Sequence, residues 1–253
     1  MTNHFEKHDV MHLSPSMLNL WISQPAMALM RIAGIRDNEA GPAAWRGNAV
    51  DRMSASAAFY PDRDIDQLTQ TALEIFDDEL DGSSQDHFEK KVLQEREAIP
   101  AYLEQAVDFY RSLGETPEES QGKVTCMLDD IPVPMLGYFD LLYADKVRDT
   151  KTVGRMVSKL TDAHARQASF YAYANNREPW IDYVGKKEVR AYKVPTPEFW
   201  NKQNILAAKT LERVLAHSDD IFECCQLVFP DLDHWMWGET TKTAAKAIWQ
   251  MED

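Results

Sequence analysis

Residues 137–152 read GYFDLLYADKVRDTKT, and this stretch decides the fold. Runs suited to β-strands lie on both sides of a short break at Ala144-Asp145. Two such runs around so short a break are typical of a β-hairpin. Residues 124–128 carry apolar side chains at every second position, which indicates one more strand before the hairpin. The sequence therefore predicts an antiparallel meander over residues 121–152 at the centre of the fold.

Helical patterns surround the meander. Ser14 suits an N-cap and Pro15 the first position of a helix. Periodicity and helix-start signals predict further helices over residues 25–34, from 42 to about 57, and over 64–80, 86–113, 161–175 and 196–217, with short strands at 181–185 and 188–194 and two helical pieces in the tail. We expect an α/β fold in one domain, with a mainly helical part at 1–115, the meander, a helix and strands at 116–194, and a helical part at 195–253.

The composition excludes several classes of protein. Of the 253 residues, 44% are hydrophobic, which is enough for a sizeable core. No apolar stretch is long enough to span a membrane, and the charged first ten residues do not resemble a secretory signal, so a cytoplasmic protein without membrane contact is expected. Three cysteines are too few for a disulfide framework or an iron–sulfur cluster of four thiolates.

The charge is unevenly distributed along the chain. The protein has a net charge of −14, yet residues 146–193 hold 11 Lys and Arg against 5 Asp and Glu. A localised basic segment can bind a polyanion even when the whole protein is acidic. Arg155, Lys159 and Arg166 lie within this segment and are candidates for contacts with phosphate groups.

The hairpin brings three charged side chains to one face. Alternation along a strand directs Asp149 and Lys151 to the same side and Thr150 to the other. A loop at residues 144 and 145 would place Asp140 opposite Asp149, whereas a loop at 145 and 146 would pair it with Lys151. Both registers gather the three groups on one face, but a three-residue loop would separate them.

Carboxylates that face each other repel, and a cation can offset this repulsion. Mg²⁺ takes oxygen ligands and keeps water for chemistry. A lysine beside it can orient or deprotonate the attacking water, or stabilise charge in the transition state. Asp140, Asp149 and Lys151 therefore form a candidate centre for metal-assisted phosphodiester hydrolysis. The sequence has no P-loop, dinucleotide-binding, zinc-protease or serine-hydrolase motif, and we expect His87 and His164 to be surface residues.

The order GYFD, DTK and then Gln167 with Tyr171 resembles the RecB-type branch of the PD-(D/E)XK nuclease superfamily, and the opening LSPSMLNLWISQP resembles its first helix. The resemblance implies a restriction-endonuclease-like core with a central mixed sheet flanked by helices. It further implies that Asp140, Asp149 and the carbonyl of Thr150 bind Mg²⁺, or Mn²⁺ as an alternative. Lys151 would serve the water, and Gln167 and Tyr171 would contact DNA.

The sequence departs from this family in two places. Where many relatives have a metal-binding histidine in a G-x-x-x-H stretch, this chain has GNAVD, so Asp51 is the expected replacement ligand. Many relatives also have an acidic residue before the meander. Glu118, Glu119 and Gln121 are the candidates here, and the sequence does not choose among them. Gln121, at the expected strand start, could bind a water or support a metal ligand. Glu119 is a candidate for the same supporting role.

Without the cysteines for an iron–sulfur cluster, this chain resembles the phage recombination exonucleases related to lambda exonuclease, rather than relatives that carry such a cluster. This resemblance implies a DNA exonuclease that acts on the ends of linear duplex in recombination or repair, in the host cytoplasm if a phage encodes it. It also implies a ring-like homo-oligomer, and it makes a single-strand annealing or binding protein a candidate partner. An endonuclease of the same fold, or a non-catalytic DNA-binding or inhibitor protein on a degenerate nuclease fold, is the alternative.

Overall fold

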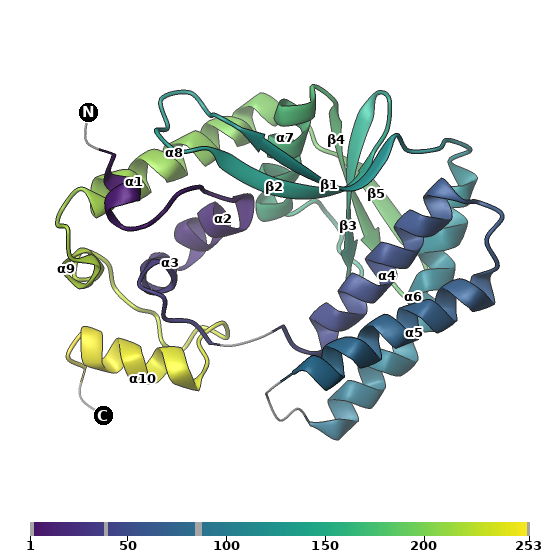
Figure 1. The fold of residues 1–253 in the computed structure, drawn as a ribbon, viewed down its shortest axis with the longest axis horizontal. Helices are drawn as coiled ribbons and strands as arrows, with labels where there is room; N and C mark the ends of the chain where they lie inside the picture. The colour runs from purple at the N-terminus through teal and green to yellow at the C-terminus, as the bar shows by residue number, and fades with distance from the viewer. Residues whose placement is uncertain (1–2, 38–39, 84–87, 252–253) are drawn as a thin grey trace. The chain divides into compact units, whose positions relative to one another are not determined.

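The computed structural model describes residues 3–37, 40–83 and 88–251 (Figure 1). It contains one five-stranded sheet in the order β1-β2-β3-β4-β5 and helices on either side of these strands in the sequence. The strands are β1 (Glu119–Cys126), β2 (Met135–Leu142), β3 (Lys146–Thr152), β4 (Glu178–Val184) and β5 (Val189–Lys193). The helices are α1 (His4–Lys7), α2 (Pro15–Ser23), α3 (Pro25–Ile32), α4 (Pro42–Phe59), α5 (Ile65–Gly82), α6 (Glu89–Ser112), α7 (Asp162–Asn175), α8 (Pro197–Leu215), α9 (Ile221–Cys225) and α10 (Glu239–Ile248).

The sheet is mixed, as expected. β2 and β3 are antiparallel, β3 and β4 are parallel, and β4 and β5 are antiparallel. The parallel pair is joined by α7, because a parallel connection needs a crossover segment of this length. The α/β fold with a central sheet flanked by helices is thus confirmed.

The chain divides into two compact units. The first comprises Met1–Asn38, Val124–Gly137 and Thr196–Asp253, and the second comprises Glu39–Lys123 and Tyr138–Pro195. In the first unit α2 packs on α3 and α8, and α3 packs on α9. The second unit contains most of the sheet and every residue singled out above as a candidate for chemistry. The organisation as a single domain stays a prediction.

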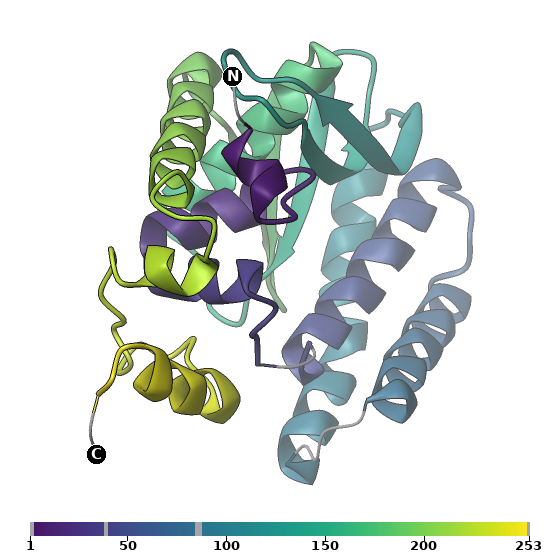
Figure 2. The ribbon, with the colours of Figure 1, turned by 60° about the vertical axis from the view of Figure 1, so that its left-hand side comes forward.

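Helices cover both faces of the strands in the second unit. α4, α5 and α6 lie side by side (Figures 1 and 2), α4 contacts β3, and α6 contacts β4 and β5. On β3 the side chain of Thr150 meets Tyr110 of α6, whereas the next residue back, Asp149, meets Gln167 of α7. Because neighbouring residues of a strand point to opposite faces, α6 and α7 cover opposite faces of β3.

Local signals explain where the key helices begin and end. The Thr161 side chain accepts a hydrogen bond from the His164 backbone and starts α7, and Asn176 ends this helix in a left-handed conformation. Ser14 caps α2 with Pro15 at its first position, as predicted. A large apolar cluster that includes Trp45, Phe76 and Tyr102 then packs α4, α5 and α6 together.

Some expectations need correction. Thr196 precedes α8, but its φ is 48° and its side chain makes no capping hydrogen bond, so Pro197 alone marks the start. β4 begins at Glu178, three residues before the expected start, since its pairing with β3 extends to Lys146. The short helix α1 was not expected. No helix in the described part of the chain is long and apolar enough to cross a membrane. The expected surface residue His87 lies outside the described residues.

Candidate active site

The hairpin adopts the first of the two predicted registers. Leu141 pairs with Arg148 and Leu142 with Val147. The backbone N–H of Tyr143 donates to the carbonyl of Lys146 over 2.8 Å and closes a two-residue loop. Continuing this register by one residue places Asp140 opposite Asp149. The pairing itself ends at Leu141 and Arg148, and the Asp140 carboxylate accepts from the backbone N–H of Thr150, next to Asp149.

Asp149 and Lys151 share one face of β3, as alternation predicts. The Lys151 ammonium lies 2.5 Å from Oδ2 of Asp149, and the Asp149 residue is only 2% exposed. Burial by itself would lower the pKa of Lys151, but the carboxylates of Asp149 and Asp140 more than offset it and raise that pKa. Lys151 is thus held as a cation among carboxylates.

Asp140 is attached to the backbone of the neighbouring strand. Its Oδ2 accepts a hydrogen bond of 2.6 Å from the backbone N–H of Thr150. Burial and the nearby carboxylates of Asp51 and Asp149 nevertheless raise the pKa of Asp140 well above its usual range. Three carboxyl groups therefore compete for the same small volume.

The third carboxyl group belongs to Asp51 of α4. Gln121 donates from Nε2 to Oδ2 of Asp51 over 2.6 Å, and the carboxyl groups of Asp51 and Asp140 are close enough to affect each other's pKa. Burial raises the pKa of Asp51 to about 6, to which repulsion by Asp149 contributes. Asp51 is therefore part of the cluster and not a solvated residue on an exposed helix face.

Gln121 reaches Asp51 through an unusual backbone conformation. Its φ is 53°, in the left-handed region that few residues other than glycine adopt. The next residue, Gly122, is buried, and a Cβ there would lie 2.1 Å from the Phe139 ring. Of the two candidates at the start of β1, Gln121 contacts the cluster, whereas Glu119 is exposed and does not hydrogen-bond Asp51.

The donor set fits a hard divalent cation. Oδ1 of Asp51 is buried and has no hydrogen-bond donor among the described residues. Such an orphaned oxygen beside two other carboxylates is costly, and a cation would relieve both the repulsion and the missing contact. Within the described ranges, no three His, Cys, Asp or Glu side chains already have the arrangement of a metal centre. The carboxylates are turned to Gln121, the Thr150 amide and Lys151 instead.

The predicted helix residues reach the cluster from α7. Gln167 donates from Nε2 to the Tyr171 hydroxyl over 2.8 Å and lies 3.5 Å from Oδ1 of Asp149. Tyr171 is 3% exposed. Burial and the charge of Asp149 raise its pKa, so the hydroxyl keeps its proton. Both side chains therefore adjoin the centre as the motif predicts.

The expectation for His164 was wrong. This residue is half-buried, and its Nδ1 lies 2.7 Å from the Tyr183 hydroxyl. Burial, followed by the charge of Lys151, lowers the pKa of His164 to about 4. Its spacing of three residues before Gln167 was the sequence signal that places it on the same helix face.

The three predicted basic residues differ in exposure. Arg155 and Lys159 are exposed in the segment between β3 and α7. This segment is held by β5, because the Val157 carbonyl accepts hydrogen bonds from Arg190 and Tyr192, each over 3.3 Å. Arg166 is only 8% exposed, which leaves its guanidinium little access to a phosphate.

A second polar network, which no pattern in the sequence predicted, lies on the opposite face of β3. Arg148 and Asp182 form a buried ion pair of 2.5 Å. The Tyr110 hydroxyl lies 2.6 Å from Oγ1 of Thr150 and donates to Asp182 over 3.1 Å. These contacts fix the backbone of Thr150 from behind, so the network supports the strand that carries Asp149 and Lys151.

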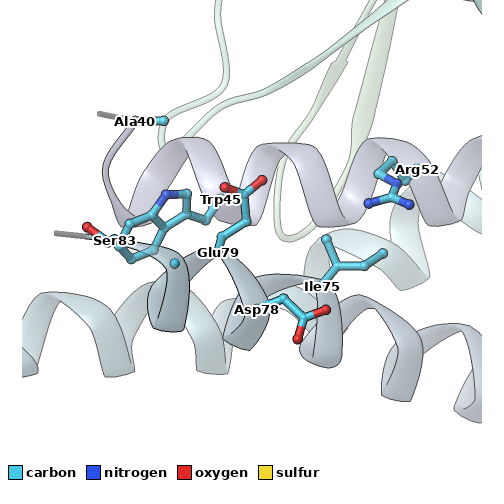
Figure 3. Close-up of a pocket in the computed structure, with 8 residues that line it drawn as sticks. Ala40, Trp45, Arg52, Ile75, Asp78, Glu79 and Ser83 are labelled. Carbon is cyan, nitrogen blue, oxygen red and sulfur yellow. The ribbon is translucent and has the colours of Figure 1, made fainter. Parts of the chain in front are cut away.

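The hollow between α4 and α5 is separate from this cluster. It has a volume of about 410 Å³ and is lined by side chains that include Trp45, Arg52 and Glu79 (Figure 3). Arg52 lines the hollow and its sequence neighbour Asp51 does not, because successive helix residues are about 100° apart. None of the candidate residues lines this hollow.

Comparison with solved structures supports the fold. A structure described as "Putative exonuclease" from Eubacterium rectale matches with a TM-score of 0.54 and 13% identity, over 96% of this chain and 92% of that chain. The structure of SSO0001 matches more weakly, with a TM-score of 0.36 and 13% identity, over 74% of this chain and 84% of that chain. No protein-family model and no curated protein matches the sequence.

Proposed function

We propose that this protein is a Mg²⁺-dependent DNA nuclease of the PD-(D/E)XK superfamily. One observation carries the proposal: Asp140, Asp149 and Lys151 lie together on the β2–β3 hairpin, and Asp51 approaches them from α4. Three carboxylates and an ammonium in this proximity are costly for the fold, and metal-assisted phosphodiester hydrolysis is a chemistry that uses such a set.

Asp51, Asp140 and Asp149 would hold the metal, and the Thr150 carbonyl is the candidate for a further ligand. Carboxylate and carbonyl oxygens suit Mg²⁺, with Mn²⁺ as an alternative. When bound, the ion would polarise the phosphodiester group and favour deprotonation of the attacking water. Gln121 would keep the Asp51 carboxylate oriented through its hydrogen bond.

Lys151 acts as an electrostatic group in this proposal. The neighbouring carboxylates raise its pKa, so the amine is protonated at neutral pH and is a poor proton acceptor. Of the roles open to it from the sequence, stabilisation of negative charge in the transition state is the one that this environment favours. Loss of such a group typically reduces turnover by two or more orders of magnitude.

The substrate we propose is linear duplex DNA, cleaved from its ends in recombination or repair. The basic segment that carries Arg155 and Lys159 would contact backbone phosphates, and Gln167 would adjoin the strand at the centre, with the buried Tyr171 hydroxyl accepting from Gln167 behind it. The neighbour described as a putative exonuclease is similar in fold and agrees with this choice. A ring-like homo-oligomer and a single-strand annealing or binding partner belong to the same proposal, through the resemblance to the phage enzymes.

The test uses end-labelled linear duplex and closed circular DNA, each with Mg²⁺ or EDTA. Loss of the linear substrate alone identifies an exonuclease, nicking of the circle identifies an endonuclease, and a mobility shift without cleavage identifies a binding protein. Lys151→Ala should reduce cleavage by at least about 100-fold, while Lys90→Ala, at an exposed residue of α6, serves as the matched control. Equal rates in Lys151→Ala and the unmodified protein would refute the assignment.

A further inference from the structure

Three polar side chains of α7 form one row along the cluster. His164, Gln167 and Tyr171 are three and four residues apart, so they share one face of the helix. Gln167 lies beside Asp149, and the charges of Lys151 and Asp149 both act on the His164 ring. Tyr183, which contacts His164, pairs with Lys151 across β3 and β4, so the imidazole lies beside the proposed catalytic lysine, one helical turn from Gln167.

Hydrogen bonds assign the position of the proton on His164. The Tyr183 side chain is fully buried, and its hydroxyl oxygen accepts from the Thr161 backbone N–H over 3.3 Å. Its other polar neighbour is Nδ1 of His164, at 2.7 Å. A buried hydroxyl proton needs an acceptor, and Nδ1 is the acceptor that the described residues offer. Tyr183 therefore donates to Nδ1, which leaves the proton of a neutral imidazole on Nε2.

The imidazole is neutral under ordinary conditions. Burial and the charge of Lys151 lower the pKa of His164 to about 4, so the ring carries no charge near pH 7. No hydrogen-bond partner is recorded for its Nε2 among the described residues. An imidazolium here would repel Lys151 and compete for Asp149, whereas a neutral N–H donor can bind an anion without disturbing the carboxylates.

We propose that His164 is a substrate-contacting residue whose Nε2–H donates to a nonbridging oxygen of a phosphate group in the bound strand, next to Lys151. This inference rests on the proposed nuclease function and deepens it. Lys151 supplies charge and His164 supplies a directional hydrogen bond from a ring that Tyr183 and Thr161 hold in one tautomer. Tyr183 is a positioning residue, because it acts through His164.

Substitutions at His164 separate contact from mere support of α7. His164→Ala should reduce kcat/KM on duplex DNA roughly 10- to 100-fold, the effect of one lost hydrogen bond to a charged group. His164→Gln places a neutral N–H donor near the Nε2 position and should retain cleavage within several-fold of the unmodified protein. His217→Ala, an exposed histidine of the first unit, is the matched control. Ala and Gln variants that are equally impaired, or both fully active, would overturn the proposal.

Two readouts are independent of cleavage. ¹⁵N NMR of histidine-labelled protein at pH 7 should show His164 as the neutral Nε2–H tautomer, and Tyr183→Phe should mix the two tautomers. In EDTA, duplex affinity should fall in His164→Ala and recover in His164→Gln. A charged ring, an Nδ1–H tautomer or equal affinities would contradict the inference. If the unmodified protein does not cleave DNA, the proposed function fails, while these two readouts still decide on His164. If the unmodified protein cleaves DNA and Lys151→Ala does not, the proposed nuclease function stands. A fully active His164→Ala would then refute only the inference about His164.

Discussion

The Lys151 ammonium lies 2.5 Å from Oδ2 of Asp149, two residues before it on the same strand. Asp140, across the hairpin, makes a different contact, since its Oδ2 accepts from the Thr150 backbone. These two neighbouring carboxylates are thus stabilised by different partners. They should respond differently to substitution even though both are proposed to bind the same metal.

The first prediction compares Asp140→Asn with Asp149→Asn in EDTA. Asp140→Asn should increase the free energy of unfolding by about 1 kcal/mol, because the amide oxygen can still accept from Thr150 and a repelled carboxylate is removed. Asp149→Asn should decrease it by about 1 to 3 kcal/mol, because Lys151 loses its ion-pair partner. Both should lose cleavage. Urea unfolding checks this, and a change of the same sign in both variants would contradict it.

The second prediction concerns stability and pH. Folding raises the pKa of Asp51 to about 6, so between its ordinary value near 4 and pH 6 the folded state binds more protons than the unfolded state. Stability therefore falls as pH rises through this window, by on the order of 2 to 3 kcal/mol for this group. Asp51→Asn should flatten that part of the profile. Denaturation in EDTA from pH 4 to 7.5 measures the difference between the two proteins, and parallel profiles would exclude the effect.

The third prediction concerns the metal. Asp51→Ala should raise the Mg²⁺ concentration needed for half-maximal cleavage by about 10-fold or more, because one of three carboxylates is lost. Asp51→His introduces the residue that many members of the resembled family carry, and it should shift the preference from Mg²⁺ towards Mn²⁺ because imidazole suits later metals. Metal titrations of activity and of melting temperature provide the measurement. An unchanged metal dependence in Asp51→Ala would remove Asp51 from the ligand set.

The fourth prediction concerns how an acidic protein binds DNA. Affinity for duplex in EDTA should fall with salt along a log–log slope of about −0.9 per phosphate contacted, with roughly 4 to 6 phosphates involved. Arg155→Glu or Lys159→Glu should weaken binding and make the slope shallower. Lys90→Glu, on α6 in the acidic half of the chain, is the control and should change little. Salt-independent binding, or equal effects at all three positions, would exclude this surface.

The fifth prediction concerns the buried network behind the centre. Asp182→Ala should destabilise the protein by about 3 to 5 kcal/mol, because the 4%-exposed Arg148 is left without its counter-ion. The double variant Arg148→Met/Asp182→Leu should be much less affected, since it removes both charges together. Thermal or urea unfolding of both proteins tests this. A double variant as unstable as Asp182→Ala would show that the loss comes from packing and not from the unpaired charge.

Local rules were sufficient for the hairpin. The two-residue period of a strand directs Asp149 and Lys151 to one face, and a short loop restricts the register to a few choices. The choice that the structure makes, with Leu141 opposite Arg148, was one of the two predicted. The N-cap at Thr161 and the common face of Gln167 and Tyr171 likewise depend only on neighbouring residues.

Contacts between distant segments were decided by the tertiary structure. Asp51 joins the cluster through the packing of α4 on β3, and Gln121 reaches it through a left-handed backbone conformation. The role of His164 depends on Tyr183, which the parallel pairing of β3 with β4 brings beneath α7. Periodicity tells which face a side chain occupies, but which segments pack on that face depends on long-range contacts and burial that no local pattern encodes. The sequence by itself therefore determined that Asp140, Asp149 and Lys151 lie near one another on the hairpin. The tertiary structure decided which further groups surround them, and those groups set the pKa of Asp140 and of Lys151.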